Sequence, residues 1–96
     1  MNITRLEFLS LAGLDQETLD IWIEEQWLVP TGAGEEVAFS KADLARAQLI
    51  LDLLEELGVN SEGVGVILHL VDQVHGLRSA MASLLESGRN KNQSSG

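Results

Sequence analysis

Apolar residues between positions 44 and 57 recur every three or four residues, which is the spacing of one face of an α-helix. Ser40 precedes this stripe as a suitable N-cap, Asp43 places a negative charge in the first turn, and Gly58 can end the helix in a left-handed conformation. The pattern predicts a helix over 40–57 that must be covered on more than one side. The apolar positions are Leu44, Ala47, Leu49, Ile50, Leu51, Leu53, Leu54 and Leu57.

Two shorter helices are predicted before it. Thr4 and Glu7 have the capping-box spacing, which predicts a first helix that Gly13 ends, and Asp15 can cap a second helix over 16–26. Together they make a helix-turn-helix over 4–26. The residues expected to face inward are Leu6, Phe8, Leu9, Leu19, Trp22, Ile23 and Gln26.

The next segment predicts a wing. Pro30 makes Val29 extended, and residues 37–39 form a second extended piece beyond a glycine-containing loop, so residues 27–39 predict a small hairpin. An isolated two-stranded hairpin is marginally stable, so this one must lean on the helices. Trp22 and Trp27 are interpreted as core residues rather than as binding residues.

A long fourth helix is predicted over 60–87, followed by a polar tail over 88–96 that is expected to be disordered. One stripe of this helix has a heptad rhythm, and a second stripe of leucines lies beside it. Only one stripe can pack on the domain, so we expect the other to hold a homodimer. The heptad stripe consists of Val64, Ile67, Val71, Val74, Arg78, Met81 and Leu85, and the second of Leu70, Leu77 and Leu84.

The net charge of −9 is unevenly distributed. Residues 1–60 carry twelve acidic and three basic residues, whereas residues 61–96 carry three of each. DNA-binding domains place lysine and arginine against phosphates, and this chain does the reverse. On the second helix, acids share one face with an exposed apolar residue, which is either an ordinary solvated face or a docking face for a basic partner. That face holds Glu17, Asp20, Ile21 and Glu24, with Glu25 nearby, and the wing loop adds Glu35 and Glu36.

Candidate chemistry is sparse. His69 and His75 diverge by about 120° around a helix, so they do not ligate one metal easily. No nucleophile, base and orienter are suggested, so we expect neither an enzyme nor a cofactor. The chain has no cysteine, and its amino terminus does not resemble a secretory signal, so a cytoplasmic location is expected.

The order of elements resembles the DNA-binding domain of MerR-type regulators, an all-α winged helix-turn-helix with four helices. The resemblance covers residues 3 to about 75, and its motifs are Thr18-Leu19, Leu28-Val29-Pro30, Phe39-Ser40-x-Ala42-Asp43-Leu44-Ala45-Arg46 and Leu57-Gly58-Val59-Asn60. DNA-binding members have an arginine and two tyrosines after the Thr-Leu pair and a Gly-Tyr-Arg in the wing. This chain has Asp20-Ile21-Trp22 and Glu35-Glu36-Val37 there.

The chain also resembles the CbpM family of chaperone modulators, on Leu57-Gly58-Val59-Asn60-x-x-Gly63-Val64 and Ile67-Leu68-x-Leu70-x-Asp72-x-Val74-x-x-Leu77. This resemblance implies binding to the J-domain of a DnaJ-like, CbpA-type co-chaperone and a block of its work with DnaK. We expect the basic J-domain helix to dock on Glu17, Asp20, Ile21, Glu24, Glu25, Glu35 and Glu36. Two alternatives are a MerR-type DNA-binding transcriptional regulator and docking of the J-domain on the long helix.

Overall fold

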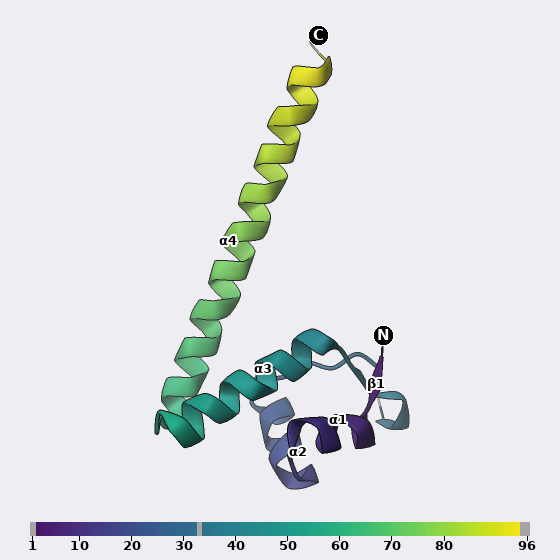
Figure 1. Ribbon diagram of the computed structural model, residues 1–96, viewed down its shortest axis with the longest axis vertical. Helices are drawn as coiled ribbons and strands as arrows, with labels where there is room; N and C mark the ends of the chain where they lie inside the picture. The colour runs from purple at the N-terminus through teal and green to yellow at the C-terminus, as the bar shows by residue number, and fades with distance from the viewer. Residues whose placement is uncertain (1, 33, 95–96) are drawn as a thin grey trace. The chain divides into compact units, whose positions relative to one another are not determined.

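The computed structural model describes residues 2–32 and 34–94, without the side chains of residue 35 and residues 89–94. Four α-helices and a small two-stranded antiparallel sheet make up the described chain, which confirms the predicted all-α class (Figure 1). The chain divides into two units, Met1–Val64 and Gly65–Gly96, which are described in turn. The elements are β1 (Ile3–Thr4), α1 (Arg5–Ala12), α2 (Gln16–Glu24), the 3-10 turn η1 (Gly34–Glu36), β2 (Ala38–Phe39), α3 (Lys41–Leu51), the π turn η2 (Asp52–Glu56) and α4 (Ser61–Ser94).

Side chains satisfy the amides at the helix starts, as the sequence predicts. The Ser40 hydroxyl accepts a hydrogen bond from the Asp43 N–H at 3.1 Å, and the Asp43 carboxylate accepts one from the Ser40 N–H at 2.9 Å. Thr4 and Glu7 form the same reciprocal box on α1. A helix start has amides without a helical partner, so these bonds fix where each helix begins. The predicted caps Thr4, Asp15, Ser40 and Asn60 are all confirmed.

Aromatic residues form the centre of the first unit. The rings of Phe8 and Phe39 stack with centroids 4.2 Å apart, and Trp22 lies 6.2 Å from Trp27. All four are buried, so the assignment of both tryptophans to the core is confirmed. The other fully buried side chains of this unit are Leu19, Leu28, Ala47, Ile50 and Val64.

Three residues predicted to face inward are exposed: Leu6 and Leu57, and Gln26 at the end of α2. Leu6 is 79% exposed, because it lies about 200° around α1 from Phe8, which faces the core. Leu57 is 71% exposed, and it follows the π turn, where its N–H bonds to the Asp52 carbonyl five residues back. That wider turn moves later residues out of the helical stripe that places Ala47 in the core.

The two-stranded sheet differs from the predicted wing hairpin. β2 pairs with β1 at the amino terminus, with Ile3 opposite Phe39. Strands of two residues are too short to show the alternation of apolar and polar residues that predicts a strand from sequence. The predicted hairpin over 27–39 is closed by a single bridge between Thr31 and Ala38. Ala38 lies opposite Thr4 of β1 on one side, and on the other side its N–H and C=O both bond to Thr31 of the wing, which ties the loop to the core.

The second helix ends two residues earlier than predicted, at Glu24 rather than at residue 26. Gln26 has a φ of 64°, in the left-handed region, and its side chain is exposed rather than inward. The Trp27 N–H then bonds to the Trp22 carbonyl at 2.9 Å. This left-handed turn ends α2 in the way that a glycine usually would.

The second unit is a single helix. α4 continues through the tail predicted over 88–96 as far as Ser94, and residues 95–96 lie outside the described part. The segment has no proline, and the single Gly88 costs a helix only about 1 kcal/mol relative to alanine. None of the described helices is long and apolar enough to cross a membrane. Large apolar side chains of this unit are exposed: Val66, Leu70, Val74, Leu77, Met81, Leu84 and Leu85.

Candidate functional site

The outer face of α2 carries the predicted acidic cluster. Glu17, Asp20 and Glu24 are all exposed, and Ile21 among them is 50% exposed. The burial of Leu19 and Trp22 on the opposite face fixes this orientation. We call Glu17, Asp20, Ile21, Glu24 and the following exposed Glu25 the acidic face.

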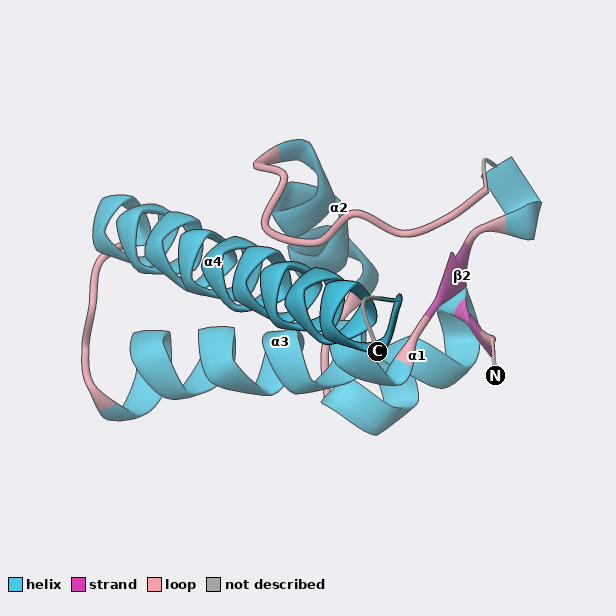
Figure 2. Cartoon of the chain, turned by 90° about the horizontal axis from the view of Figure 1, so that it is seen from above, coloured by secondary structure: helices cyan, strands magenta, loops and turns pink. Residues whose placement is uncertain are grey.

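The wing acids are less closely associated with it. Glu36 is exposed in η1, which lies at the far end of the loop that leaves α2 (Figure 2). The side chain of Glu35 lies outside the described residues. The acidic face of α2 is therefore the part of the predicted docking surface that the structure brings together.

Asp20 is engaged within the chain, which the sequence did not indicate. Its Oδ1 lies 3.3 Å from Nη1 of Arg5 and accepts a hydrogen bond of 2.8 Å from the Gln16 side chain. Arg5 is the first residue of α1, so this ion pair joins the two helices of the helix-turn-helix. Exposed ion pairs contribute at most about 1 kcal/mol, so the pair can open at low cost.

The cations of the first unit are few. The sequence places only Arg5, Lys41 and Arg46 within residues 1–64. Arg5 pairs with Asp20, and Nε of Arg46 donates a hydrogen bond to the Trp27 carbonyl. Two of the three cations therefore make bonds inside the fold, and no group of arginines and lysines is left to grip a phosphate backbone.

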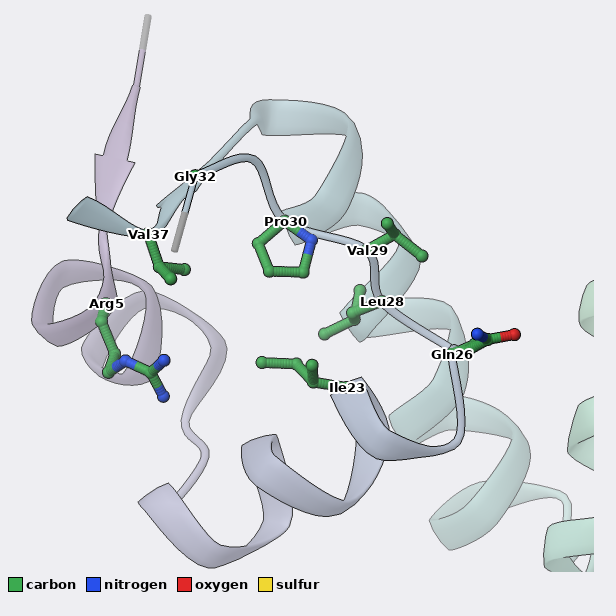
Figure 3. A pocket seen from close by; sticks show the side chains of 8 residues that line it. All are labelled: Arg5, Ile23, Gln26, Leu28, Val29, Pro30, Gly32 and Val37. Carbon is green, nitrogen blue, oxygen red and sulfur yellow. The ribbon is translucent and has the colours of Figure 1, made fainter. Parts of the chain in front are cut away.

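An open hollow of about 310 Å³ adjoins the acidic face. Ile23, Leu28, Pro30 and Val37 point into it, and the Arg5 side chain lies at its edge (Figure 3). Gln26 and Val29 also line it, but their side chains point outward. Ile23 follows Asp20 by three residues on α2, so the hollow and the Arg5–Asp20 pair are neighbours on one helix face.

Gly32 holds the wing side of the hollow in place. Its φ is 82°, and a Cβ there would lie 2.6 Å from the Glu36 carbonyl oxygen. Only glycine fits this close approach of two backbone segments. The loop therefore keeps Val37 beside the end of α2.

Two capping acids next to this site, Glu7 and Asp15, have lowered pKa values. Hydrogen bonds from Thr4, first from its side chain and then from its backbone, lower the pKa of Glu7. Hydrogen bonds from Thr18, in the same order, lower the pKa of Asp15. Both carboxylates are thus held in the charged form at the starts of α1 and α2, where the helix dipole also favours negative charge.

The predicted dimer residues lie on α4. Ile67 and Val71 are half-buried, and Val74, Met81 and Leu85 are exposed. An open groove of about 360 Å³ runs along this helix, lined by Ile67, Leu70, Val71, Val74, His75 and Arg78. Val64 is fully buried within the single chain, so it is not available to a second copy. Among the described residues, no three histidine, aspartate or glutamate side chains are grouped as metal ligands.

A model of the family described as "MerR HTH family regulatory protein" matches residues 3–86. The match runs from β1 through the helix-turn-helix, the wing loop and α3 into α4. No curated protein and no solved structure matches the chain.

Proposed function

The chain belongs to the MerR HTH family of regulatory proteins, and from this premise we propose that it is a non-catalytic chaperone modulator. It binds the J-domain of a CbpA-type co-chaperone through the acidic face of α2 and blocks the cooperation of that co-chaperone with DnaK. The observation that carries the proposal is the charge of this face, which occupies the place where the DNA-binding members of the resembled family carry basic and aromatic residues.

The contacts of the remaining charges support a protein partner rather than a nucleic acid. Arg5 and Arg46 make bonds within the fold, whereas the side-chain carboxylates of Glu17, Glu24 and Glu25 have no hydrogen bond or ion pair to another described residue. A carboxylate facing a phosphate is repelled, whereas the same carboxylate attracts a lysine- or arginine-rich helix.

The mechanism needs no chemistry. A basic helix is drawn to the acidic face by its charge, and Ile21 supplies an apolar contact at the centre. While the helix is bound, the surface that DnaK needs is covered, so inhibition is competitive. Association should slow as salt rises, because exposed charges are screened within about 10 Å at 0.1 M salt.

A charge-reversal pair tests the proposal. Glu17→Lys with Glu24→Lys leaves the Arg5–Asp20 pair untouched, and we expect it to weaken J-domain binding by more than tenfold in a calorimetric titration. The matched control is Glu55→Lys with Glu56→Lys, which changes the net charge equally on exposed residues away from α2. Equal weakening by both pairs, or by neither, would remove the acidic face from the mechanism.

DNA binding is the second candidate, and family membership is the observation that favours it. A fluorescence anisotropy titration of duplex DNA at low salt separates the two functions. Tight binding that weakens steeply with salt would favour a transcriptional regulator, since released counterions give DNA binding that dependence.

The proposal includes a homodimer through α4. Its seam consists of Ile67, Val71, Val74, Arg78, Met81 and Leu85. The exposed apolar side chains of the second unit support it, because an apolar stripe of this length on one helix is usually covered by a partner. The absence of cysteine fits a reducing compartment, so the proposal places the protein in the cytoplasm.

A further inference from the structure

We propose that Arg5 is an internal competitor for the partner's cation, and that the adjoining hollow receives an apolar side chain of the same partner helix. This inference rests on the function proposed above and specifies how the acidic face is occupied. In the unbound chain the Arg5 guanidinium occupies Oδ1 of Asp20 at 3.3 Å. A lysine or arginine of the partner takes its place when the complex forms.

The geometry of the site makes the exchange possible. The Arg5 side chain is only one third exposed and lies at the edge of the hollow, whereas the Asp20 side chain is 59% exposed. The Asp20 carboxylate is therefore accessible from solvent while it holds Arg5. Exposed ion pairs are weak, so an incoming cation can displace Arg5 without disturbing the core.

The hollow specifies the second contact. Its walls are the apolar side chains of Ile23, Leu28, Pro30 and Val37 (Figure 3), and its volume of about 310 Å³ is at the lower end for a ligand pocket. That size and polarity suit one or two apolar side chains. Binding there removes apolar surface from water on both partners.

Charge identifies the occupant as part of a basic helix. Asp20 and Glu24 flank Ile23 on α2, and the exposed Glu36 precedes Val37. Residues three or four apart on a helix are neighbours, with Cβ atoms about 5–6 Å apart. A helix with a cation and an apolar residue at that spacing can meet Asp20 and the hollow at once, because Asp20 and Ile23 are themselves three residues apart.

The first test asks whether removing the Arg5 side chain strengthens or weakens J-domain binding. Arg5→Ala leaves Asp20 without its internal cation and with only the neutral amide of Gln16 bonded to it, so we expect J-domain binding to become about three- to tenfold tighter. Lys41→Ala is the matched control: it removes the same charge from an exposed residue at the start of α3, and we expect less than a twofold change. Arg5→Gln, which keeps most of the side-chain length, should repeat the gain if Arg5→Ala perturbs the fold.

The outcomes separate the two proposals. If Arg5→Ala and Arg5→Gln bind no tighter than Lys41→Ala, or bind more weakly than the wild type, the competitor role of Arg5 is overturned. The proposed function still stands in that case, provided that the wild type binds and reversal of Glu17 and Glu24 weakens it. Failure of the wild type to bind a J-domain overturns both.

The second test uses two valines of the same lining. Val37 points into the hollow and Val29 points outward at 73% exposed (Figure 3). We expect Val37→Ala to weaken J-domain binding by about three- to tenfold, because it removes two methyl groups that are buried in the contact. Val29→Ala should weaken binding by less than about twofold. Equal effects of the two substitutions would show that the hollow stays empty in the complex.

Discussion

The two units of this chain differ in how their apolar residues are covered. In residues 1–64 the large apolar side chains of Phe8, Phe39 and Trp22 are buried, with Phe8 stacked on Phe39 and Trp22 beside Trp27. Side-chain hydrogen bonds cap the starts of α1, α2 and α3. In residues 65–88 the leucines at 70, 77 and 84 are all more than half exposed. The stability of the first unit is therefore internal, whereas these exposed leucines of the second unit gain nothing until another surface covers them.

The charges follow the same division. Most acids lie before residue 60, on the unit whose core is buried within the chain, and as surface residues they can be arranged for recognition without loss of that core. The second unit is nearly neutral and apolar on its exposed positions, which suits self-association more than steering of a charged partner. We infer that recognition and assembly are assigned to different parts of one short chain.

The largest expected effect comes from the core of the first unit. Phe8 is fully buried and stacks on Phe39, so Phe8→Ala should lower the free energy of unfolding by about 3–5 kcal/mol. Leu6→Ala on the same helix removes a side chain that is 79% exposed, and we expect a change within about 0.5 kcal/mol. Urea unfolding followed by circular dichroism measures both. Similar losses for the two variants would mean that α1 is not packed as described.

The next effect concerns the second unit. A charge at Val71 lies within the proposed dimer seam, so Val71→Glu should weaken self-association by more than tenfold, which is about 1.4 kcal/mol or more. Sedimentation equilibrium over a range of concentrations measures the change. Gln73→Glu, two residues away on an exposed side of the same helix, adds the same charge and should leave self-association unchanged.

This experiment also tests the alternative docking site. Under the proposed function, Val71→Glu removes the dimer but leaves one acidic face per chain, so the intrinsic affinity for the J-domain should be retained. Loss of both properties together would move the partner from α2 to α4. A wild type that is monomeric at all concentrations would remove the seam and leave the exposed apolar residues of the second unit unexplained.

Local chemistry explains why so much of the first unit could be predicted. Caps such as Ser40 and Asn60 work through contacts within three residues, so their signatures are readable in the sequence. The burial of Trp22 likewise followed from the 3.6-residue period of α2. The features that the sequence did not predict depend on contacts between distant residues or on irregular backbone conformations. They are the pairing of β1 with β2, the left-handed turn at Gln26 and the π turn before Leu57.

The site was predicted in part for the same reason. The acidic face is a property of one helix, and its periodicity placed Glu17, Asp20 and Glu24 together. The pairing of Asp20 with Arg5 joins residues fifteen apart, and the hollow combines α1, α2 and the wing, so neither has a local signature. The one available signal was that Arg5 is the only cation among the first forty residues, where any acid in reach would attract it.

The smallest expected effect is the response of the capped unit to acid. The pKa values of Glu7 and Asp15 are lowered from ordinary values of 4.5 and 3.8 by bonds that exist only in the folded chain. The unfolded chain therefore binds a proton more readily at these groups. Their contribution to stability is complete above about pH 5 and is lost as the pH falls through 4.5 and below.

Substitutions that keep the caps but remove the titration isolate this contribution. Glutamine can replace Glu7 in a capping box, and asparagine is as good an N-cap as Asp15. Glu7→Gln with Asp15→Asn should thus be about as stable as the wild type at pH 7 and should lose less stability between pH 5 and pH 3, measured by urea unfolding at each pH. Acid also relieves the repulsion among the carboxylates of a chain with a net charge of −9, so the control variant must have the same net charge as the capping variant.

Glu24→Gln with Glu86→Gln is that control, because it removes two negative charges without touching a cap. The dependence of its unfolding free energy on pH should stay parallel to that of the wild type. If the capping variant is the one that stays parallel, the acid response of the first unit comes from its total charge and not from its helix starts.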